Sequence, residues 1–336
     1  MNRCAIPTLD LAPFRSNARS PDALRLTEEL REVCHEHGFF YVTGHGVDEE
    51  LTDRMQLLAR RFFALPDADR LAIANVHSPQ FRGFTPVGHE YTQNRPDRRE
   101  QLDIGRELPP PVLQPGDPAW LRLRGPNLWP AALPELRGAV ESWAAAMEQL
   151  GRVVCHALAL ALRQDATRFD ALLSPHPEIL VKIIRYPGAD GGQRQGVGEH
   201  RDTGLVTFVA QDGRGGLQVN LAGEWIDVPP RPGAFVVNLG EMMQLLTNGY
   251  FAATVHRVVS PPPGADRVSI AYFFNPKLEA TPAPLDLPPD LAAEAPGGAS
   301  IDAANPIFAN YGDNSLKVRL RAHPDVARRH HADLLS

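Results

Sequence analysis

Two histidines and one aspartate in the second half of the chain have the residue types and the spacing of a metal site. His200 and Asp202 are two residues apart, so on extended backbone both side chains leave from the same face while Arg201 points away. His256 follows in a second segment of β-rich sequence. Two imidazoles and one carboxylate on one side of a metal leave the opposite coordination positions open, an arrangement that suits Fe(II) chemistry with dioxygen. These three residues therefore predict an oxygen-activating metal site.

A His-x-Asp pair is weak evidence by itself, because it arises by chance in roughly one chain in three of this length. A later segment adds Arg267 and Ser269, which share one face of a predicted strand with Ala271 and Phe273. Arginine presents a planar fork of donors that matches a carboxylate, and a neighbouring serine can add a hydrogen bond to the same group. The alternative is a surface ion pair. We expect a carboxylate-binding site near the metal.

The order of these residues resembles the isopenicillin N synthase-like branch of the 2-oxoglutarate/Fe(II)-dependent dioxygenases. Other segments resemble that branch in order and spacing and extend the resemblance over nearly the whole chain; they are Ile6–Leu11, Gly38–Val47, Arg82–Phe84, Gly125–Pro130, Tyr186–Pro187, Gly215–Val219, Thr247–Gly249 and His256–Val258. The resemblance implies that His200, Asp202 and His256 bind Fe(II), and that 2-oxoglutarate and O2 are cosubstrates.

The resemblance also assigns the cosubstrate contacts. Arg267 and Ser269 would hold the distal carboxylate of 2-oxoglutarate, and Tyr186 matches the tyrosine before proline that helps to bind it in relatives. One position departs from the pattern. Many plant relatives read Asn-Tyr-Tyr-Pro, whereas this chain has Ile184 in place of the asparagine, and Ile184 cannot supply the amide contact.

The function implied is oxidation of a C–H bond of a small organic metabolite, by hydroxylation, desaturation or cyclisation, with release of succinate and CO2. An amino-acid-derived or other natural-product intermediate fits this expectation. The substrate-pocket candidates are Phe273, Val197, Leu205, Leu217 and Arg82, chosen because they neighbour the metal and cosubstrate segments. For Phe273, packing in the core is an equal alternative.

Three rival functions remain open at this point. A same-fold Fe(II) oxidase that does not use 2-oxoglutarate, like isopenicillin N synthase or the ethylene-forming oxidase, also carries an Arg-x-Ser pair. A non-enzymatic binding protein could keep the fold, although the complete metal triad argues against it. A nucleic-acid demethylase has the right chemistry but needs a basic, aromatic groove that this sequence lacks.

Composition agrees with an enzyme that acts on small molecules. The chain has 336 residues, of which 43% are hydrophobic and 22% charged, and its net charge of −6 offers no basic field for nucleic acid. Cys4, Cys34 and Cys155 have no C-x-x-C spacing, so neither disulfides nor a thiolate site is indicated. The sequence shows no signal peptide and no membrane span. We expect a cytoplasmic enzyme with a small-molecule substrate and no nucleic-acid, membrane or protein partner.

The first half of the chain predicts mixed α and β structure. Ser20 and Pro21 are typical of a helix start, and this helix should end near Gly38 and lead into a strand at 39–43. A second helix is expected from about Glu49 to Phe63, and a proline-rich loop over 109–134. A long helix should follow, because hydrophobic residues recur at helical spacing from Val140 to Leu162. His156 on that helix is taken as structural.

The second half predicts a β core. Seven short strands are expected, at Leu180–Tyr186, Leu205–Gln211, Leu217–Asn220, Glu224–Val228, Ala234–Leu239, Thr254–Val259 and Arg267–Asn275. Gly188–Gly198 is expected to be a loop, while Asn314–Arg321 and Pro324–His331 are expected to be helices. With the resemblance, this predicts an α+β, mainly β fold, a double-stranded β-helix (jelly roll) flanked by helices. Residues 1–135 would pack on the core formed by 136–336, as one compact unit.

Overall fold

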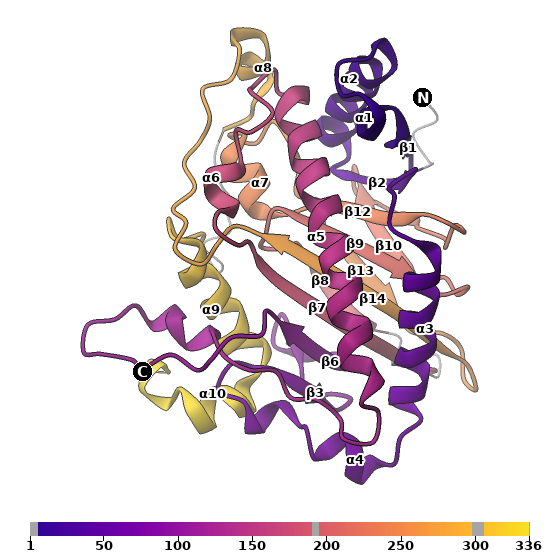
Figure 1. Cartoon of the computed structure of the whole chain (residues 1–336), viewed down its shortest axis with the longest axis vertical. Coiled ribbons are helices and arrows are strands. Elements are labelled where there is room, and N and C mark those ends of the chain that lie inside the picture. The colour runs from indigo at the N-terminus through magenta and orange to yellow at the C-terminus, as the bar shows by residue number, and fades with distance from the viewer. Residues whose placement is uncertain (1–5, 190–194, 298–305, 336) are drawn as a thin grey trace.

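Two β-sheets face each other at the centre of the computed structural model, which describes residues 6–189, 195–297 and 306–335 (Figure 1). The larger sheet has eight strands in the order β1-β2-β12-β9-β14-β7-β6-β3, and the smaller has four in the order β11-β10-β13-β8. The strands of the larger sheet are β1 (Thr8–Asp10), β2 (Phe39–Thr43), β3 (Gly83–Thr85), β6 (Glu100–Gly105), β7 (Glu178–Pro187), β9 (Val206–Gln211), β12 (Phe235–Leu239) and β14 (Asp266–Asn275). Those of the smaller sheet are β8 (Gln195–His200), β10 (Leu217–Leu221), β11 (Glu224–Asp227) and β13 (His256–Val259), and a separate hairpin pairs β4 (Tyr91–Thr92) with β5 (Arg95–Pro96).

The helices surround these sheets. They are α1 (Ala12–Ser16), α2 (Pro21–Glu36), α3 (Glu49–Phe63), α4 (Asp67–Leu71), α5 (Glu135–Ala161), α6 (Asp170–Leu173), α7 (Glu241–Leu246), α8 (Pro289–Glu294), α9 (Tyr311–Ala322) and α10 (Pro324–His330), with short 3-10 turns at Asn75–His77, Ala119–Leu123 and Ala332–Leu334. Figure 1 shows α5 crossing the larger sheet, while α9 and α10 lie beside β3 and β6. The mainly β core with flanking helices is the architecture that the sequence predicts.

Most predicted elements are confirmed within one or two residues at each end. The helix predicted to start at Ser20 and Pro21 is α2, and it begins as expected, because the Ser20 side chain accepts a hydrogen bond from the backbone N–H of Ala23 and Pro21 occupies the first helical position. His156 is half-buried, and its Nε2 lies 3.0 Å from an Asp170 carboxylate oxygen, which fits the structural role expected for it. All seven predicted strands are present.

The expected loop over Gly188–Gly198 is partly wrong. Residues 190–194 lie outside the described residues, as does Cys4, but Gln195 already begins β8, which pairs antiparallel with β13. Glycine has low strand propensity, and pairing with a neighbouring strand outweighs it here. The space also requires glycine, because a Cβ on Gly196 would lie 2.8 Å from the Tyr186 ring. β8 ends at His200, so Asp202 lies just beyond the strand rather than on it.

The larger sheet has two chemically different faces. On β14, Val268, Ile270, Tyr272 and Phe274 belong to the large core cluster that includes residues of α2, α3 and α5. We call the opposite side the inner face; it carries Ala271 and Phe273 of β14 and shares a second cluster with Val197, Leu217 and Val258 of the smaller sheet. The period of two along each strand therefore separates a helix-covered core from a space between the sheets.

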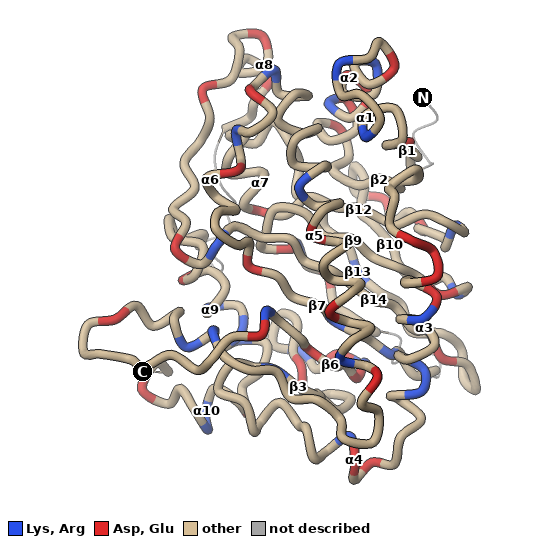
Figure 2. The backbone as a smooth tube through the Cα atoms, viewed as in Figure 1, with Lys and Arg blue, Asp and Glu red and all other residues tan. Residues whose placement is uncertain are grey.

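The N-terminal region contributes directly to this sheet. β1, β2, β3 and β6 all come from residues before 136, and β6 pairs with β7 from Gly105↔Leu180 to Glu100↔Arg185. Basic and acidic positions are intermixed along the molecule, including around β3 and β6 (Figure 2). Among the described residues, no helix is both long and apolar enough to cross a membrane.

Trp143 anchors α5 on the larger sheet, and its removal should destabilise the whole fold. The side chain is fully buried, with its ring centre 5.9 Å from that of Tyr272 and 6.4 Å from that of Phe235. Trp143→Ala should lower the free energy of unfolding by about 3–5 kcal/mol, through lost burial and the cavity left behind. Urea denaturation measures the change, with Arg137→Ala, an exposed position on the same helix, as the control. A loss below about 1 kcal/mol in Trp143→Ala would contradict the anchoring role.

Candidate metal centre

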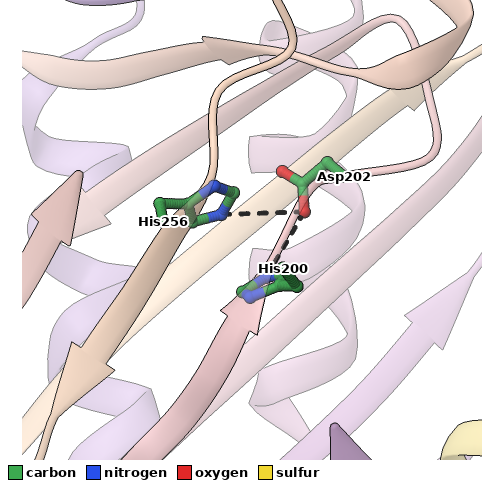
Figure 3. Close-up of side chains that lie close together, drawn as sticks. All are labelled: His200, Asp202 and His256. Carbon is green, nitrogen blue, oxygen red and sulfur yellow. Dashed lines mark ion pairs between the residues drawn. The ribbon is translucent and has the colours of Figure 1, made fainter. Parts of the chain in front are cut away.

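Three side chains converge between the two sheets, as Figure 3 shows. His200 at the end of β8 and His256 at the start of β13 are register partners, and their ring centres are 4.3 Å apart. The Asp202 Oδ1 atom lies 3.7 Å from Nε2 of His200 and 3.8 Å from Nε2 of His256. Among the described residues, this is the one group of three histidine, cysteine or acidic side chains close enough to hold a metal ion. The predicted triad therefore comes together in space.

The other ring nitrogen of each histidine is fixed by the backbone. His200 Nδ1 lies 2.8 Å from the Gly198 carbonyl oxygen, and His256 Nδ1 lies 3.1 Å from the Thr254 carbonyl oxygen. A carbonyl can only accept, so each Nδ1 carries the proton, and each Nε2 lone pair is left free toward Asp202. This tautomer and ring orientation are what a metal-binding imidazole needs.

Asp202 divides its two carboxylate oxygens between the sheet and the histidines. Its Oδ2 accepts hydrogen bonds from Thr207 Oγ1 at 2.5 Å and from Asn238 Nδ2 at 2.7 Å. Thr207 of β9 and Asn238 of β12 are register partners, so two adjacent strands of the larger sheet hold the same oxygen. Oδ1 is left to face the two imidazoles, which fits a single metal–oxygen bond.

The protonation states also suit a metal. Burial, followed by the charge of the neighbouring His256, lowers the pKa of His200 to about 4. Burial alone would raise the pKa of Asp202, but the two histidines and the hydrogen bonds from Asn238 and Thr207 outweigh it, so the pKa is lowered. At neutral pH His200 is therefore a neutral nitrogen donor and Asp202 an ionised carboxylate, and both are donors that fit Fe(II).

The guanidinium of Arg267 is buried on the inner face without an acidic partner. The residue is 1% exposed; its Nη1 lies 3.3 Å from Ser269 Oγ, and its Nη2 donates to Gln211 Oε1 at 2.9 Å. Among the described residues, no carboxylate lies within ion-pair distance of it. The Tyr186 ring lies under the guanidinium at 5.0 Å. A buried cation with only neutral partners is costly, so this position is suited to binding an anion.

The substrate-pocket candidates fall in three different places. Phe273, Val197 and Leu217 belong to the inner-face cluster, as expected for residues near the site. Leu205, just before β9, is fully buried and belongs to the large core cluster. Arg82 lies over Gly105, where its Nη2 contacts Glu178 at 3.4 Å, so its charge is already paired.

A further group of buried polar side chains lies on the inner face at the β6 end of the sheet. We name it the inner-face polar cluster; its members are Thr85, Glu90, Asp97, Arg99, Gln101, Asp103, Lys182, Arg319 and His323. Strands β3, β6 and β7 supply four of them, and the C-terminal segment supplies Arg319 and His323. This cluster is the main feature that the sequence reasoning missed.

Some of the missed residues carry a signal in the sequence. Asn238 is a lone amide in the apolar strand Phe235–Leu239, and Lys182 is a charge flanked on both sides by apolar residues of β7. A single polar residue in a buried strand needs a partner, so each marks a specific contact. Gln211 carries no comparable signal, because polar residues are common at strand ends.

Two family models match the chain, one in each half. Residues 6–132 match the N-terminal region of the non-haem dioxygenases described for morphine synthesis, and residues 178–276 match the 2OG-Fe(II) oxygenase superfamily. The second range holds all the metal and cosubstrate candidates. The first holds the strands β1, β2, β3 and β6.

Similar proteins cover nearly the full length. The 2-oxoglutarate-dependent dioxygenase frbJ of Dothideomycetidae sp. (strain 11243) is 35% identical over 97% of this chain and 91% of its own. A homoarginine-6-hydroxylase of Arabidopsis thaliana is 33% identical over 84% of this chain and 88% of its own. A full-length Neurospora crassa protein, solved in complex with alpha-KG and thymine, superposes with a TM-score of 0.75 and 25% identity, covering 98% of each chain.

Asn238 should control metal affinity without being a ligand. Asn238→Leu removes one of the two hydrogen bonds that orient Asp202, and loss of such a supporting contact weakens metal binding by about 10–100-fold. Anaerobic calorimetric titration with Fe(II) measures the dissociation constant without turnover. Gln114→Leu, in an exposed loop, is the matched amide-to-alkyl control. Equal affinities in Asn238→Leu and the parent protein would contradict the orienting role.

His323 should make the fold less stable in mild acid. Burial lowers its pKa to about 4, against opposing charges from Glu90 and Asp103. The unfolded chain therefore takes up the proton first, near pH 6.5, so native stability falls as the pH drops through 6.5 toward 4. From pH 7.5 to pH 5 this residue should account for about 2 kcal/mol of lost stability. In His323→Gln, the free energies of unfolding measured by denaturation at pH 7.5 and pH 5 should differ by less than in the parent protein. The same difference in both proteins would contradict a buried neutral imidazole at His323.

Proposed function

This chain belongs to the 2OG-Fe(II) oxygenase superfamily and is a 2-oxoglutarate- and Fe(II)-dependent dioxygenase, and we propose that His200, Asp202 and His256 hold its iron. When bound, iron and cosubstrate supply the oxygen activation that oxidises a C–H bond of a small organic metabolite, with release of succinate and CO2. The protein contributes the orientation of the ligands. Hydrogen bonds from Thr207 and Asn238 direct one oxygen of Asp202 toward the metal position, and the backbone fixes both imidazole tautomers.

The observation that carries the cosubstrate assignment is the buried guanidinium of Arg267. A dicarboxylic acid supplies the anion that the protein itself does not place there, and a guanidinium binds a carboxylate through two parallel hydrogen bonds. Ser269 Oγ, 3.3 Å from Nη1, is placed to donate to the same carboxylate. Tyr186 restricts the guanidinium from the other side, so the fork keeps one orientation. Ile184 is the register partner of Ser269, and its alkyl side chain supplies packing instead of an amide.

We assign the substrate to the inner face, near Phe273, Val197 and Leu217, because these residues lie on the same face as Arg267 and Ser269 or pack against it. Leu205 packs in the large core cluster instead and is assigned no substrate contact. The names of the relatives contain different compounds: one is named for homoarginine, and another was solved in complex with thymine. The residues of this chain therefore determine which bond of its substrate is oxidised and what product results.

A same-fold oxidase that does not use 2-oxoglutarate is the remaining alternative. A relative named for 2-oxoglutarate dependence, 35% identical over 97% of this chain, favours the dioxygenase. The two activities also differ in what Arg267 does, because an oxidase without this cosubstrate needs no dicarboxylate at the buried guanidinium.

Arg267→Met should weaken 2-oxoglutarate binding without changing Fe(II) binding. Loss of the guanidinium removes the charge-assisted contacts to the distal carboxylate and should weaken 2-oxoglutarate binding by about 100-fold or more. Anaerobic titration of the Fe(II) protein with 2-oxoglutarate, followed by its charge-transfer absorption, measures the affinity; admission of air then yields succinate for quantification.

Two comparisons make this test specific. Arg122→Met removes an ion pair to Asp333 far along the chain and should leave 2-oxoglutarate affinity unchanged. Fe(II) affinity in Arg267→Met should also stay within a few-fold of the parent. If the parent protein gives neither charge-transfer absorption nor succinate, the dioxygenase assignment fails; if Arg267→Met binds 2-oxoglutarate normally, only the role of Arg267 fails.

A further inference from the structure

The inner-face polar cluster is not needed to bind iron or 2-oxoglutarate, yet it is buried beside both sites. Asp97 Oδ1 accepts a hydrogen bond from the backbone N–H of Gly198 at 3.1 Å, two residues before His200. On the sheet, Gln101 pairs with Ile184, and Ile184 pairs with Ser269. The cluster therefore borders the metal strand on one side and the cosubstrate residues on the other.

The acidic members of the cluster are already matched by cations. Glu90 Oε1 lies 2.8 Å from Lys182 Nζ, and Glu90 Oε2 lies 3.0 Å from Arg99 Nη2 in an ion-pair contact that is not aligned as a hydrogen bond. Asp103 Oδ2 lies 2.7 Å from Arg319. Three carboxylates thus face three cations, Asp97 being held by Arg99 at 3.3 Å. The cluster needs no additional counter-ion.

Its hydrogen-bonding groups are not all matched. Thr85 Oγ1, Gln101 Oε1, Arg99 Nε and His323 Nε2 are buried and have no hydrogen-bond partner. Thr85 and Gln101 are 1% and 0% exposed, and they are register partners on β3 and β6, so their side chains leave the sheet side by side. Buried polar atoms are nearly always hydrogen-bonded, so four unmatched atoms in one cluster require partners that the protein itself does not supply there.

The unmatched atoms specify which hydrogen-bond donors and acceptors a bound molecule would have to supply. Arg99 Nε can only donate, so it requires an acceptor oxygen, whereas Gln101 Oε1 can only accept, so it requires an N–H or O–H donor. The amide of Gln101 is oriented by its own Nε2, which donates to Asp103 Oδ1 at 2.9 Å. The side chains of Arg99 and Lys182 keep 10% and 9% of their surface exposed, while Asp103 keeps none.

We propose that the inner-face polar cluster recognises the primary substrate, and that this substrate is a small polar molecule with an N–H donor beside a carbonyl or carboxylate oxygen. The oxygen accepts from Arg99, and the N–H donates to Gln101 and Thr85. α-Amino acids and nucleobase-like heterocycles both carry this pair, whereas an apolar carboxylic acid carries the oxygen alone. The proposal rests on the proposed function, because it places the substrate against the iron and 2-oxoglutarate assigned above.

Two panels of probes test the substrate class. One contains amino acids, including L-homoarginine, and nucleobases, including thymine; the other contains apolar acids of similar size, including indole-3-acetic acid and decanoic acid. Binding is measured by anaerobic calorimetry on the Fe(II)·2-oxoglutarate protein, and succinate formation is measured in air. Members of the polar panel should bind and raise succinate formation at least tenfold, and the responding arm distinguishes amino acids from heterocycles. Response to no polar probe, or to the apolar acids alone, overturns the proposal.

Variants of Thr85 and Gln101 test the residues. Thr85→Val keeps the shape of the side chain but removes the hydroxyl, and Gln101→Leu removes the acceptor; each should weaken binding of the best polar probe, and raise its KM, about tenfold. Thr85→Ser restores the hydroxyl and should recover most of the affinity. Gln114→Leu is the distant control. Unchanged dissociation constants in Thr85→Val and Gln101→Leu would show that the cluster serves packing alone and would overturn the proposal.

The dioxygenase assignment and the substrate class are tested separately. Absence of both the charge-transfer absorption and succinate in the parent protein removes the dioxygenase assignment itself. Normal 2-oxoglutarate binding and succinate formation that the polar probes do not raise would leave that assignment intact and remove only the substrate class. The charge-transfer titration is repeated on every variant, so that a variant that has lost its fold is recognised before its probe affinity is interpreted.

Discussion

The two-residue alternation of the larger sheet is the constraint on which the rest of the structure depends. On β14, four apolar side chains face the helices while Arg267 and Ser269 face the opposite side. The same alternation on β6 and β7 places Asp103 and Lys182 on the inner face and their apolar neighbours in the core. A slip of one residue in any of these strands would bury charges against the helices and expose the core. The apolar face of the larger sheet, packed against the helices, fixes the register of its strands. This register is what allows the inner face to carry polar groups.

Much of the fold could be predicted from local sequence. α5 has a continuous apolar stripe, α2 has a serine and proline at its start, and the strands from Leu180 onward are separated by glycine and proline. β8 could not be predicted in this way, since its glycines disfavour a strand and only the pairing with β13 and the close approach of Tyr186 require them. β6 was missed for a related reason: the Asp103 charge interrupts its apolar pattern, and its partners lie far along the chain.

The metal and cosubstrate candidates could be proposed from the sequence because part of each signal is short and local, His200-x-Asp202 and Arg267-x-Ser269, to which His256 and Tyr186 are added from other segments. The groups that orient them could not. Asp202 is held by Thr207 and Asn238 from two different strands, and Arg267 is held by Gln211, contacts that exist only after the sheet has formed. Sequence motifs mark the reacting groups, whereas the hydrogen bonds that fix their geometry come from tertiary structure.

The pairing of His200 with His256 would give a metal bound there a structural role as well. His200 is the last residue of β8 and His256 the first residue of its antiparallel partner β13, and β8 is an edge strand of the smaller sheet, paired on one side only. A metal ion held by both imidazoles would tie the two strands together where they pair last, and Asp202, which accepts hydrogen bonds from Thr207 and Asn238, would extend that tie to the larger sheet. Iron would then act as a cross-link between the two walls of the jelly roll, closing a long stretch of chain much as a disulfide does. Loss of the metal would then remove catalytic activity and loosen the β8 edge of the smaller sheet at the same time.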